Sequence, residues 1–260
     1  MSDGRYWRAL WPRRRSRKLE GSGDLLRHFP DLDPAFVPLY QACRAATMTS
    51  VERLYALYKS VEYVVRADIP GDFVECGVWR GGSVMMMALA LQTFGGAGRR
   101  LYCFDTFEGM PPPGGRDIRH ETGETAAELL ANDASGGDGG FHARAPLEEV
   151  ERNIAATGYP AELVTYCQGR VEETLPASAP ERVALVRLDT DWYQSTKHEL
   201  VCLYPRLSAG GVLIIDDYGF FRGAREATDE YFTESGNPIL LHRIDNTGRI
   251  GIKAAGPLTG

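Results

Sequence analysis

Four aspartates lie in two short stretches of the sequence, and each stretch follows an apolar run. Asp189 and Asp191 come after VALVRL, and Asp216 and Asp217 come directly after VLII. If the two runs are neighbouring parallel strands, the four carboxylates meet at one edge of a sheet, where like charges disfavour joint ionisation. A hard divalent cation relieves this repulsion, and oxygen ligands without His or Cys indicate Mg²⁺, Ca²⁺ or Mn²⁺. The alternative is that single aspartates only cap the helices that follow.

A second stretch, VECGVWRGGS, has the pattern of a strand, a glycine turn and the start of a helix. Gly77 lets the chain leave the strand sharply, and Gly81 and Gly82 let a ligand approach backbone N–H groups. Asp105 ends the next apolar run, and in doubly wound folds an acid at this place binds a ribose diol. The stretch therefore predicts a cofactor that contains a nucleoside. The spacing differs from GxGxxG and GxxxxGK[ST], which disfavours NAD and ATP.

Other residues give weaker signals. His198 could reach the acids from the following helix, or it could face solvent. His120 and His142 lie in a glycine-rich segment and could close over a substrate, although loop histidines without a ligand are commoner. Trp79 follows Gly77 of the glycine turn, and Trp192 follows Asp191 of the acidic stretch. Each could stack on a base or sugar or simply fill the edge of the domain.

These residues need elements that bring them together, and the sequence alternates between apolar runs and helical patterns. The predicted strands cover 72–77, 100–105, 162–169, 183–191 and 210–217, and the predicted helices cover 83–94, 146–157, 193–207 and 222–234. Strands that alternate with helices predict a parallel sheet with helices on both faces. Residues 239–242 and 249–254 form a last pair of strands, and the IDNTG segment between them predicts an antiparallel hairpin.

The N-terminal part has a different pattern. Residues 1–22 hold five basic residues in a run of six, which predicts a solvated tail or, alternatively, a contact for an anionic partner or membrane surface. Residues 23–70 predict a helical cap. Within it, apolar residues recur at three and four positions over 50–66, and Ser50 or Thr49 is the expected helix cap.

Residues 71–260 predict one further domain, which a long loop at 111–145 interrupts. The loop is rich in Pro and Gly, and only 124–131 shows helical signals. Loops of this length inside compact domains are usually functional lids or disordered segments. We therefore expect a lid-like loop.

The composition excludes several classes of protein. The 260 residues carry a net charge of −6, with 43% hydrophobic and 25% charged residues, as in soluble globular chains. No apolar run approaches the roughly 20 residues of a membrane span, and the basic N-terminus lacks the apolar region of a signal peptide. The acidic balance argues against a nucleic-acid binder. The cysteines are widely spaced, and Cys76 and Cys103 lie inside apolar runs, so we expect core residues and a reducing cytoplasm.

Five segments together resemble the macrocin O-methyltransferase family, which comprises sugar O-methyltransferases of antibiotic biosynthesis that depend on S-adenosylmethionine and Mg²⁺. The segments are DFVECGVWRGGS, CFDTFEGMP, GRVEETLP, LVRLDTDWYQSTKHEL and GGVLIIDDYG, and the resemblance covers about residues 47–254. It implies a class I methyltransferase (Rossmann-like) α/β fold, with a doubly wound, mostly parallel sheet, a C-terminal antiparallel hairpin and extra N-terminal helices. It also implies a homo-oligomer and a sugar-containing small molecule as methyl acceptor.

The resemblance further implies a role for each candidate site residue. For the methionine part of the cofactor, the implied residues are Glu75, Gly77, Trp79, Arg80, Gly81 and Ser83. For its ribose and adenine, they are Asp105, Gly169, Arg170 and Val171. For Mg²⁺, they are Asp189, Asp216 and Asp217. Asp191 is the implied general base, and its role is not separated here from that of Asp189.

The chemistry agrees with this assignment. A sugar hydroxyl has a pKa far above neutral pH and is a poor nucleophile, and a metal ion that chelates two vicinal hydroxyls lowers that pKa. A nearby carboxylate can then accept the proton. A catechol-like diol would suit the same chemistry. Two rival interpretations are a glycosyltransferase that uses Asp189 and Asp191 as a DxD motif and a catalytically silent scaffold.

Overall fold

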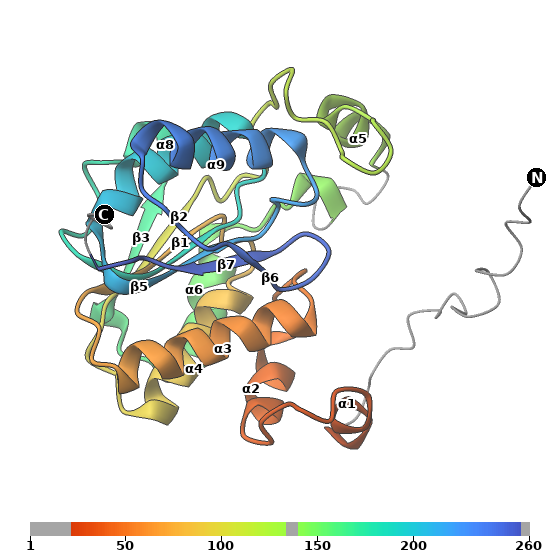
Figure 1. Ribbon diagram of the computed structural model, residues 1–260. Coiled ribbons are helices and arrows are strands. Elements are labelled where there is room, and N and C mark those ends of the chain that lie inside the picture. Colours follow the sequence, from red (N-terminus) through yellow and green to blue (C-terminus); the bar gives the residue numbers. More distant parts are fainter. Residues whose placement is uncertain (1–21, 134–139, 256–260) are drawn as a thin grey trace, which may run out of the picture.

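One sheet runs through the part of the chain that the computed structural model describes, residues 22–133 and 140–255 (Figure 1). Its strands are β1 (Asp72–Cys76), β2 (Leu101–Asp105), β3 (Val164–Gln168), β4 (Val183–Leu188), β5 (Leu207–Ile215), β6 (His242–Arg243) and β7 (Arg249–Ile252). The order across the sheet is β3-β2-β1-β4-β5-β7-β6. Strands β1 to β5 pair in parallel, and β7 runs antiparallel to both β5 and β6. The predicted α/β class with a mostly parallel sheet and a closing hairpin is confirmed.

Helices cover both faces of the sheet (Figure 1). The helices are α1 (Ser22–His28), α2 (Phe36–Cys43), α3 (Val51–Arg66), α4 (Gly82–Phe94), α5 (Ala126–Asn132), α6 (Leu147–Ala155), α7 (Val171–Thr174), α8 (Tyr193–Leu203) and α9 (Arg222–Ser235). Apolar side chains of α3, α4 and α6 pack on one face, and those of α7, α8 and α9 pack on the other. Alternate residues of β1 serve the two cores, because successive strand side chains point to opposite faces: Phe73 joins the first core and Val74 the second.

Helix α3 begins where the sequence indicates. The Ser50 hydroxyl accepts a hydrogen bond from the Arg53 backbone N–H, which confirms Ser50 as the cap. Tyr58 on this helix is fully buried and packs against Phe36 and Phe94. The N-terminal helices therefore have a continuous core with α4. The predicted basic tail, residues 1–22, lies outside the described residues except for its last position.

The carboxyl ends of β4 and β5 lie side by side, and this is what brings the aspartates together. Leu188 is in register with Ile215, and the Asp216 N–H donates to the Leu188 carbonyl at 2.9 Å. The Asp189 N–H donates to the Cys76 carbonyl at 2.8 Å, so β1 joins the same edge. All six residues of β4 are buried, as expected for a central strand covered on both faces.

The hairpin differs in detail from its prediction. The second-to-last strand is His242–Arg243 rather than 239–242. The reason is the turn: the Asp245 carboxylate accepts hydrogen bonds from the Thr247 and Gly248 N–H groups, and the ladder forms directly beside it. Hydrogen bonds from the side chain of a turn residue fix the register that a residue pattern leaves open.

The long loop carries the predicted short helix. Helix α5 spans Ala126–Asn132, and Thr125 and Glu128 form a capping box at its start. Residues 134–139 are outside the described part. Helix α7, only four residues long, is an element that the sequence pattern did not predict.

Small and flexible apolar residues fill the core as expected. Cys76, Cys103 and Met86 are fully buried in the two clusters, and the five cysteines are free thiols. The buried cysteines and methionines therefore serve packing.

In the described residues, no helix combines the length and the apolar character that crossing a bilayer requires.

Candidate active site

A cavity of about 290 Å³ opens at the carboxyl ends of the parallel strands. The turns that follow β1 to β5 and the segment 46–49 before α3 form its wall. Ligands of doubly wound sheets bind at this edge. The predicted site residues that line the cavity are Gly77, Trp79, Ser83, Asp105, Gly169, Arg170, Val171, Asp189, Asp191, Asp216 and Asp217.

The turn after β1 is shaped by its contact with the turn after β4. Gly77 has a φ of 84°, and a Cβ atom there would lie 2.0 Å from the Asp189 carbonyl oxygen. Real Cβ atoms do not approach backbone so closely, so only glycine fits. Trp79, two residues later, has a φ of 46°, which is uncommon outside glycine and is typical of functional turns. The predicted cofactor turn and the acidic turn are thus one packed unit.

Three predicted residues do not line the cavity. Glu75 lies beneath it, and its carboxylate pairs with Arg187 at 2.5 Å. Arg80 pairs with Glu149 of α6 at 3.0 Å, and Gly81 packs against α6. These residues hold the turn from behind, and the predicted direct contact of each with the cofactor has no support in the shape of the cavity.

Asp105 is tied to backbone groups of the surrounding turns. Its Oδ2 accepts hydrogen bonds from the N–H groups of Val78 at 2.6 Å and Trp79 at 3.0 Å, and its Oδ1 accepts one from Phe107 at 2.8 Å. A carboxylate has about four acceptor positions; backbone N–H groups use three of them, and the Thr106 hydroxyl lies 3.5 Å from Oδ1. Asp105 therefore fastens the two turns together, and the predicted contact with a ribose hydroxyl would need the remaining position.

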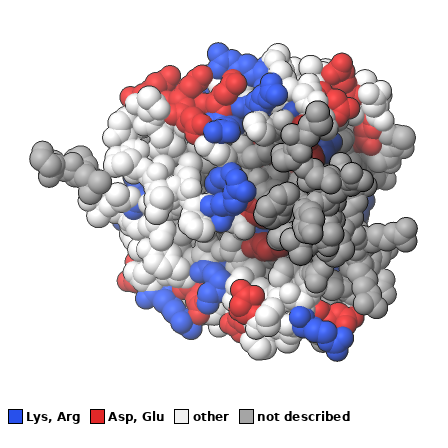
Figure 2. All heavy atoms as spheres, turned by 45° about the vertical axis from the view of Figure 1, so that its right-hand side comes forward, with Lys and Arg blue, Asp and Glu red and all other residues white. Residues whose placement is uncertain are grey.

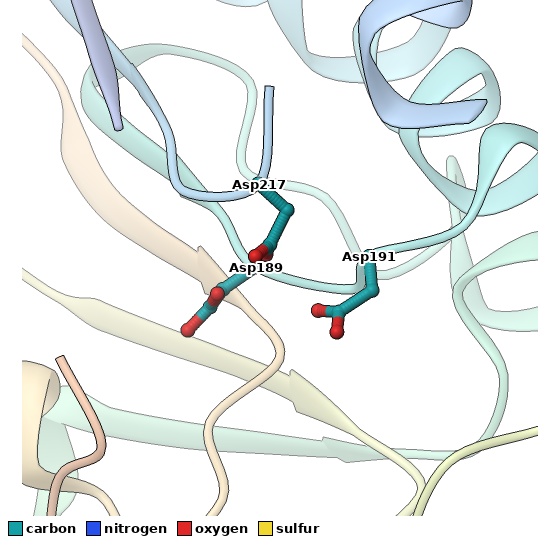
Figure 3. A group of neighbouring side chains, drawn as sticks. All are labelled: Asp189, Asp191 and Asp217. Carbon is teal, nitrogen blue, oxygen red and sulfur yellow. The ribbon is translucent and has the colours of Figure 1, made fainter. Parts of the chain in front are cut away.

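Three of the four aspartates lie close together at the carboxyl ends of β4 and β5 (Figure 3). One oxygen from each of Asp189, Asp191 and Asp217 can be chosen so that all lie within 4.8 Å of one another. Asp191 has a φ of 68°, an unusual value for a residue other than glycine. The Asp217 Oδ2 atom is buried and has no hydrogen-bond partner in the described structure. Converging carboxylate oxygens with one of them unpartnered fit a hard divalent cation.

Asp216 has different partners. Its Oδ1 accepts from the Arg187 guanidinium at 2.5 Å, and its Oδ2 pairs with Arg53. Arg187 is buried in β4 and also contacts Asp189 at 2.7 Å. Arg53 reaches in from α3 and contacts Asp245 of the hairpin turn at 3.0 Å. The predicted metal set of Asp189, Asp216 and Asp217 thus lines one cavity, and Asp216 differs from Asp217 because both of its oxygens already face guanidinium groups.

Burial and mutual repulsion of the aspartates outweigh the two arginines in this site. Burial, followed by the Asp189 carboxylate, raises the pKa of Asp191 well above its usual range. Burial, followed by Asp191, does the same for the pKa of Asp217. For Asp216, burial raises the pKa to about 6 against the opposing effect of Arg187. A cation bound among these groups would favour their ionised forms.

Apolar side chains on four connecting segments also line the cavity and are together called its apolar rim. They come from Met48 before α3, Met110 after β2, Phe141 in the long loop and Phe220 after β5. The rings of Phe141 and Phe220 lie 6.3 Å apart between centroids. This rim suits an acceptor with an apolar body next to its hydroxyl groups.

The histidine and second tryptophan candidates lie elsewhere. No histidine is among the described residues that line the cavity. His198 Nε2 lies 3.2 Å from the Leu175 carbonyl oxygen, beside the end of α7. Trp192 is buried, donates to the Pro111 carbonyl at 3.0 Å and packs on Phe221, so it supports the long loop. Trp79 does line the cavity.

Sequence reasoning missed the two arginines. Arg187 gave a signal, since it is the one charged residue in the apolar run VALVRL. Arg53 gave none, because its partner Asp216 is 163 positions away and its helix has the periodicity of an ordinary amphipathic helix.

The charge on the molecular surface is mixed. On the face shown in Figure 2, the described Lys and Arg side chains alternate with Asp and Glu.

Comparisons with known proteins give consistent results. The macrocin-O-methyltransferase (TylF) family profile matches residues 40–250. The 8-demethyl-8-(2,3-dimethoxy-alpha-L-rhamnosyl)-tetracenomycin-C 4'-O-methyltransferase of Streptomyces olivaceus is 36% identical over 219 residues, which are 84% of this chain and 80% of that protein. The demethyldecarbamoylnovobiocin O-methyltransferase of Streptomyces niveus is 34% identical over 78% of this chain and 74% of its own. The solved structure of the O-methyltransferase NovP has a TM-score of 0.69 at 31% identity and covers 81% of this chain and 83% of that one.

Proposed function

Because this chain belongs to the macrocin O-methyltransferase family, we propose that it transfers the methyl group of S-adenosylmethionine to a hydroxyl of a sugar carried by a natural product. The observation that carries the proposal is the juxtaposition, in one cavity, of the glycine turn after β1 and the acidic turns after β4 and β5. The proposal that the methyl acceptor is a sugar rests on the names of the relatives, among them the tetracenomycin rhamnoside enzyme.

We assign the cofactor to the part of the cavity between β1, β2 and β3. The Trp79 and Ser83 side chains and the Gly169–Val171 turn line this part. Trp79 Nε1 is buried without a hydrogen-bond partner among the described residues, so it can donate to a bound ligand. The acidic residues across the cavity favour the positive charge of the sulfonium group.

We assign a divalent cation, with Mg²⁺ as the proposed ion, to Asp189 and Asp217, and Asp216 stays a proposed further ligand. When bound, the ion would lower the pKa of a chelated sugar hydroxyl. Asp191 lies beside these residues and would accept the proton of the attacking hydroxyl. As the new C–O bond forms, the bond between methyl carbon and sulfur breaks and leaves a neutral thioether.

The acceptor would enter over the apolar rim. Met48, Met110, Phe141 and Phe220 would contact the body of the acceptor, and the rim would keep water from the reacting atoms. A catechol-like diol stays as the second candidate acceptor, because the same pair of vicinal hydroxyls could chelate the ion.

Calorimetry on metal-stripped protein tests the cofactor first. We expect S-adenosylmethionine to bind with micromolar affinity, and we expect methyl transfer to glycosides, but not to the matching aglycones, to require Mg²⁺. Asp217→Asn should abolish the Mg²⁺-dependent activity, whereas Asp229→Asn, at an exposed position of α9, should behave like the wild type. A protein that binds no cofactor would refute the proposal, and transfer to catechols alone would replace the sugar.

A further inference from the structure

Two side chains of α8 point at a single residue of the acidic turn. Ser195 and Glu199 are four positions apart, so they share one face of the helix, and both are buried. The Thr190 hydroxyl donates to Glu199 Oε1 at 2.8 Å. The Ser195 hydroxyl lies 3.3 Å from the Thr190 carbonyl oxygen, which also accepts from the Trp192 N–H at 2.8 Å. The hydroxyl of Thr190 is therefore held by α8, and its carbonyl oxygen by the start of α8, where the Ser195 hydroxyl is shared with the Trp192 carbonyl oxygen at 3.1 Å.

Thr190 separates the two aspartates that matter most to the site. Asp189 precedes it with its carbonyl oxygen pressed against Gly77, and Asp191 follows it with a φ of 68°. Such a backbone conformation persists outside glycine only where the surroundings hold it. On one side the turn is held by Gly77 at the exit of β1, and on the other by Ser195 and Glu199.

Glu199 has no cationic partner among the described residues that would explain a buried acid. Its side chain is fully buried, and Oε2 has no hydrogen-bond partner in the described structure. The neighbouring Lys197 pairs with Glu234 at 2.6 Å instead, and the Cys76 thiol beside Glu199 is a weak donor. A buried acid with no counter-cation is costly, so its bond to Thr190 is the contact that best accounts for its presence.

We propose that Thr190 is a positioning residue of this enzyme, fastened by Glu199 and Ser195 so that Asp191 and Asp189 face the reacting atoms. The inference rests on the proposed function. Neither the Thr190 hydroxyl nor the Glu199 carboxylate needs to touch a substrate. Without the contacts of Thr190 with Glu199 and Ser195, the turn relaxes and the Asp191 carboxylate moves away from the acceptor hydroxyl.

Paired variants of the full-length protein test this directly. Thr190→Val keeps the shape and removes the hydroxyl, and Thr190→Ser keeps the hydroxyl. Glu199→Met removes the acceptor, and Glu199→Gln keeps an amide oxygen that can accept. Thr228→Val on α9 is the matched control, because its buried hydroxyl bonds the Ala224 carbonyl at 2.7 Å, within α9.

The readouts are kcat, KM for S-adenosylmethionine, Mn²⁺ affinity by calorimetry, and thermal unfolding. We expect Thr190→Val and Glu199→Met to lower kcat and Mn²⁺ affinity by about 10–100-fold each, with KM for the cofactor nearly unchanged. Thr190→Ser and Glu199→Gln should recover most of both. Thr228→Val should lower only the unfolding temperature.

Two results separate the possible failures. If the wild type binds Mn²⁺ and transfers methyl groups but Thr190→Val behaves like Thr228→Val, the positioning role is wrong and the proposed function stands. If the wild type neither binds Mn²⁺ nor transfers methyl groups, the proposed function fails and the inference fails with it. Should Thr190→Val not fold, the comparison of Glu199→Gln with Glu199→Met decides in the same way.

Discussion

At the scale of single residues, neighbouring aspartates of the same stretch have different surroundings. Asp217 has a buried oxygen without a partner in the described structure, whereas both oxygens of Asp216 face arginines. A ligand position that is already neutralised by two guanidinium groups gains less from a cation than one that is not. The two residues should therefore respond differently to the same substitution.

We expect Asp217→Asn to weaken Mn²⁺ binding at least about tenfold and to leave folding nearly intact. Asp216→Asn should weaken Mn²⁺ binding less and lower the free energy of unfolding by about 1–3 kcal/mol, because Arg53 and Arg187 lose a charged partner. Calorimetric titration with Mn²⁺ and urea unfolding of both variants measure the difference. Equal losses of metal affinity would show that Asp216 contributes as much to metal binding as Asp217 does.

Gly77 gives a second prediction at this scale. Gly77→Ala would force a Cβ atom against the Asp189 carbonyl oxygen, whereas Gly95→Ala has the same positive φ and open space around it. We expect Gly95→Ala to cost about 1 kcal/mol of stability and Gly77→Ala at least about 2 kcal/mol more, with loss of activity. Urea unfolding measures both. Equal costs would mean that the turn can move away from β1.

At the scale of elements, sequence periodicity located the long helices and the buried strands because that signal is local. Helix α3 and its Ser50 cap follow from residues that are neighbours in the chain. The pairing of Arg53 with Asp216 does not follow from neighbouring residues, because it arises where α3 packs against the end of β5. For the same reason the sequence predicts that the four aspartates lie close together, but it does not predict which of them pair with an arginine.

Asp105 is a second residue whose position, but not whose hydrogen-bond partners, could be predicted from the sequence. Its place at the end of β2 was predictable, and the three backbone N–H groups that occupy its oxygens were not, because they depend on how the turns after β1 and β2 fold against each other. A residue's position in a fold can thus be clear from sequence while its partners are not.

Helix α8 carries a prediction about pH. Burial raises the pKa of Glu199 from its usual 4.5 to about 8. Between these values the folded protein keeps a proton that the unfolded chain has lost, so this group's contribution to stability falls as pH rises from 4.5 to 8. Glu199→Gln removes the effect. We expect the variant to gain at least about 1 kcal/mol relative to the wild type between about pH 5 and pH 8 in urea unfolding. Parallel pH profiles of the two proteins would contradict a raised pKa.

At the scale of the whole molecule, the cavity joins segments from most of the described chain. The segment 46–49 before α3 meets the start of α4, where the Gly82 N–H donates to the Ala46 carbonyl at 2.9 Å, and the hairpin contributes Thr247. A ligand that fills the cavity therefore connects the N-terminal helices, the sheet and the hairpin. Its binding should be visible in global unfolding.

We expect S-adenosylhomocysteine at about 100 times its Kd to add about 2.7 kcal/mol to the folded state and to raise the melting temperature by about 5–10 °C. Differential scanning calorimetry with and without the ligand measures the shift. Adenosine alone at the same concentration is the control, and it should give a smaller shift because it leaves the β1 turn without a partner. No shift with S-adenosylhomocysteine would mean that the folded protein does not bind it, which would contradict the cofactor assignment.

The apolar rim has a further consequence for how enzymes of this kind diversify. Met48, Met110, Phe141 and Phe220 stand on four connecting segments, and the proposed chemistry stands on the turns after β1, β4 and β5. Connecting segments accept substitutions and changes of length more readily than the strands they join. A lineage could therefore exchange one acceptor for another by altering these segments, while its apparatus for methyl transfer is inherited unchanged.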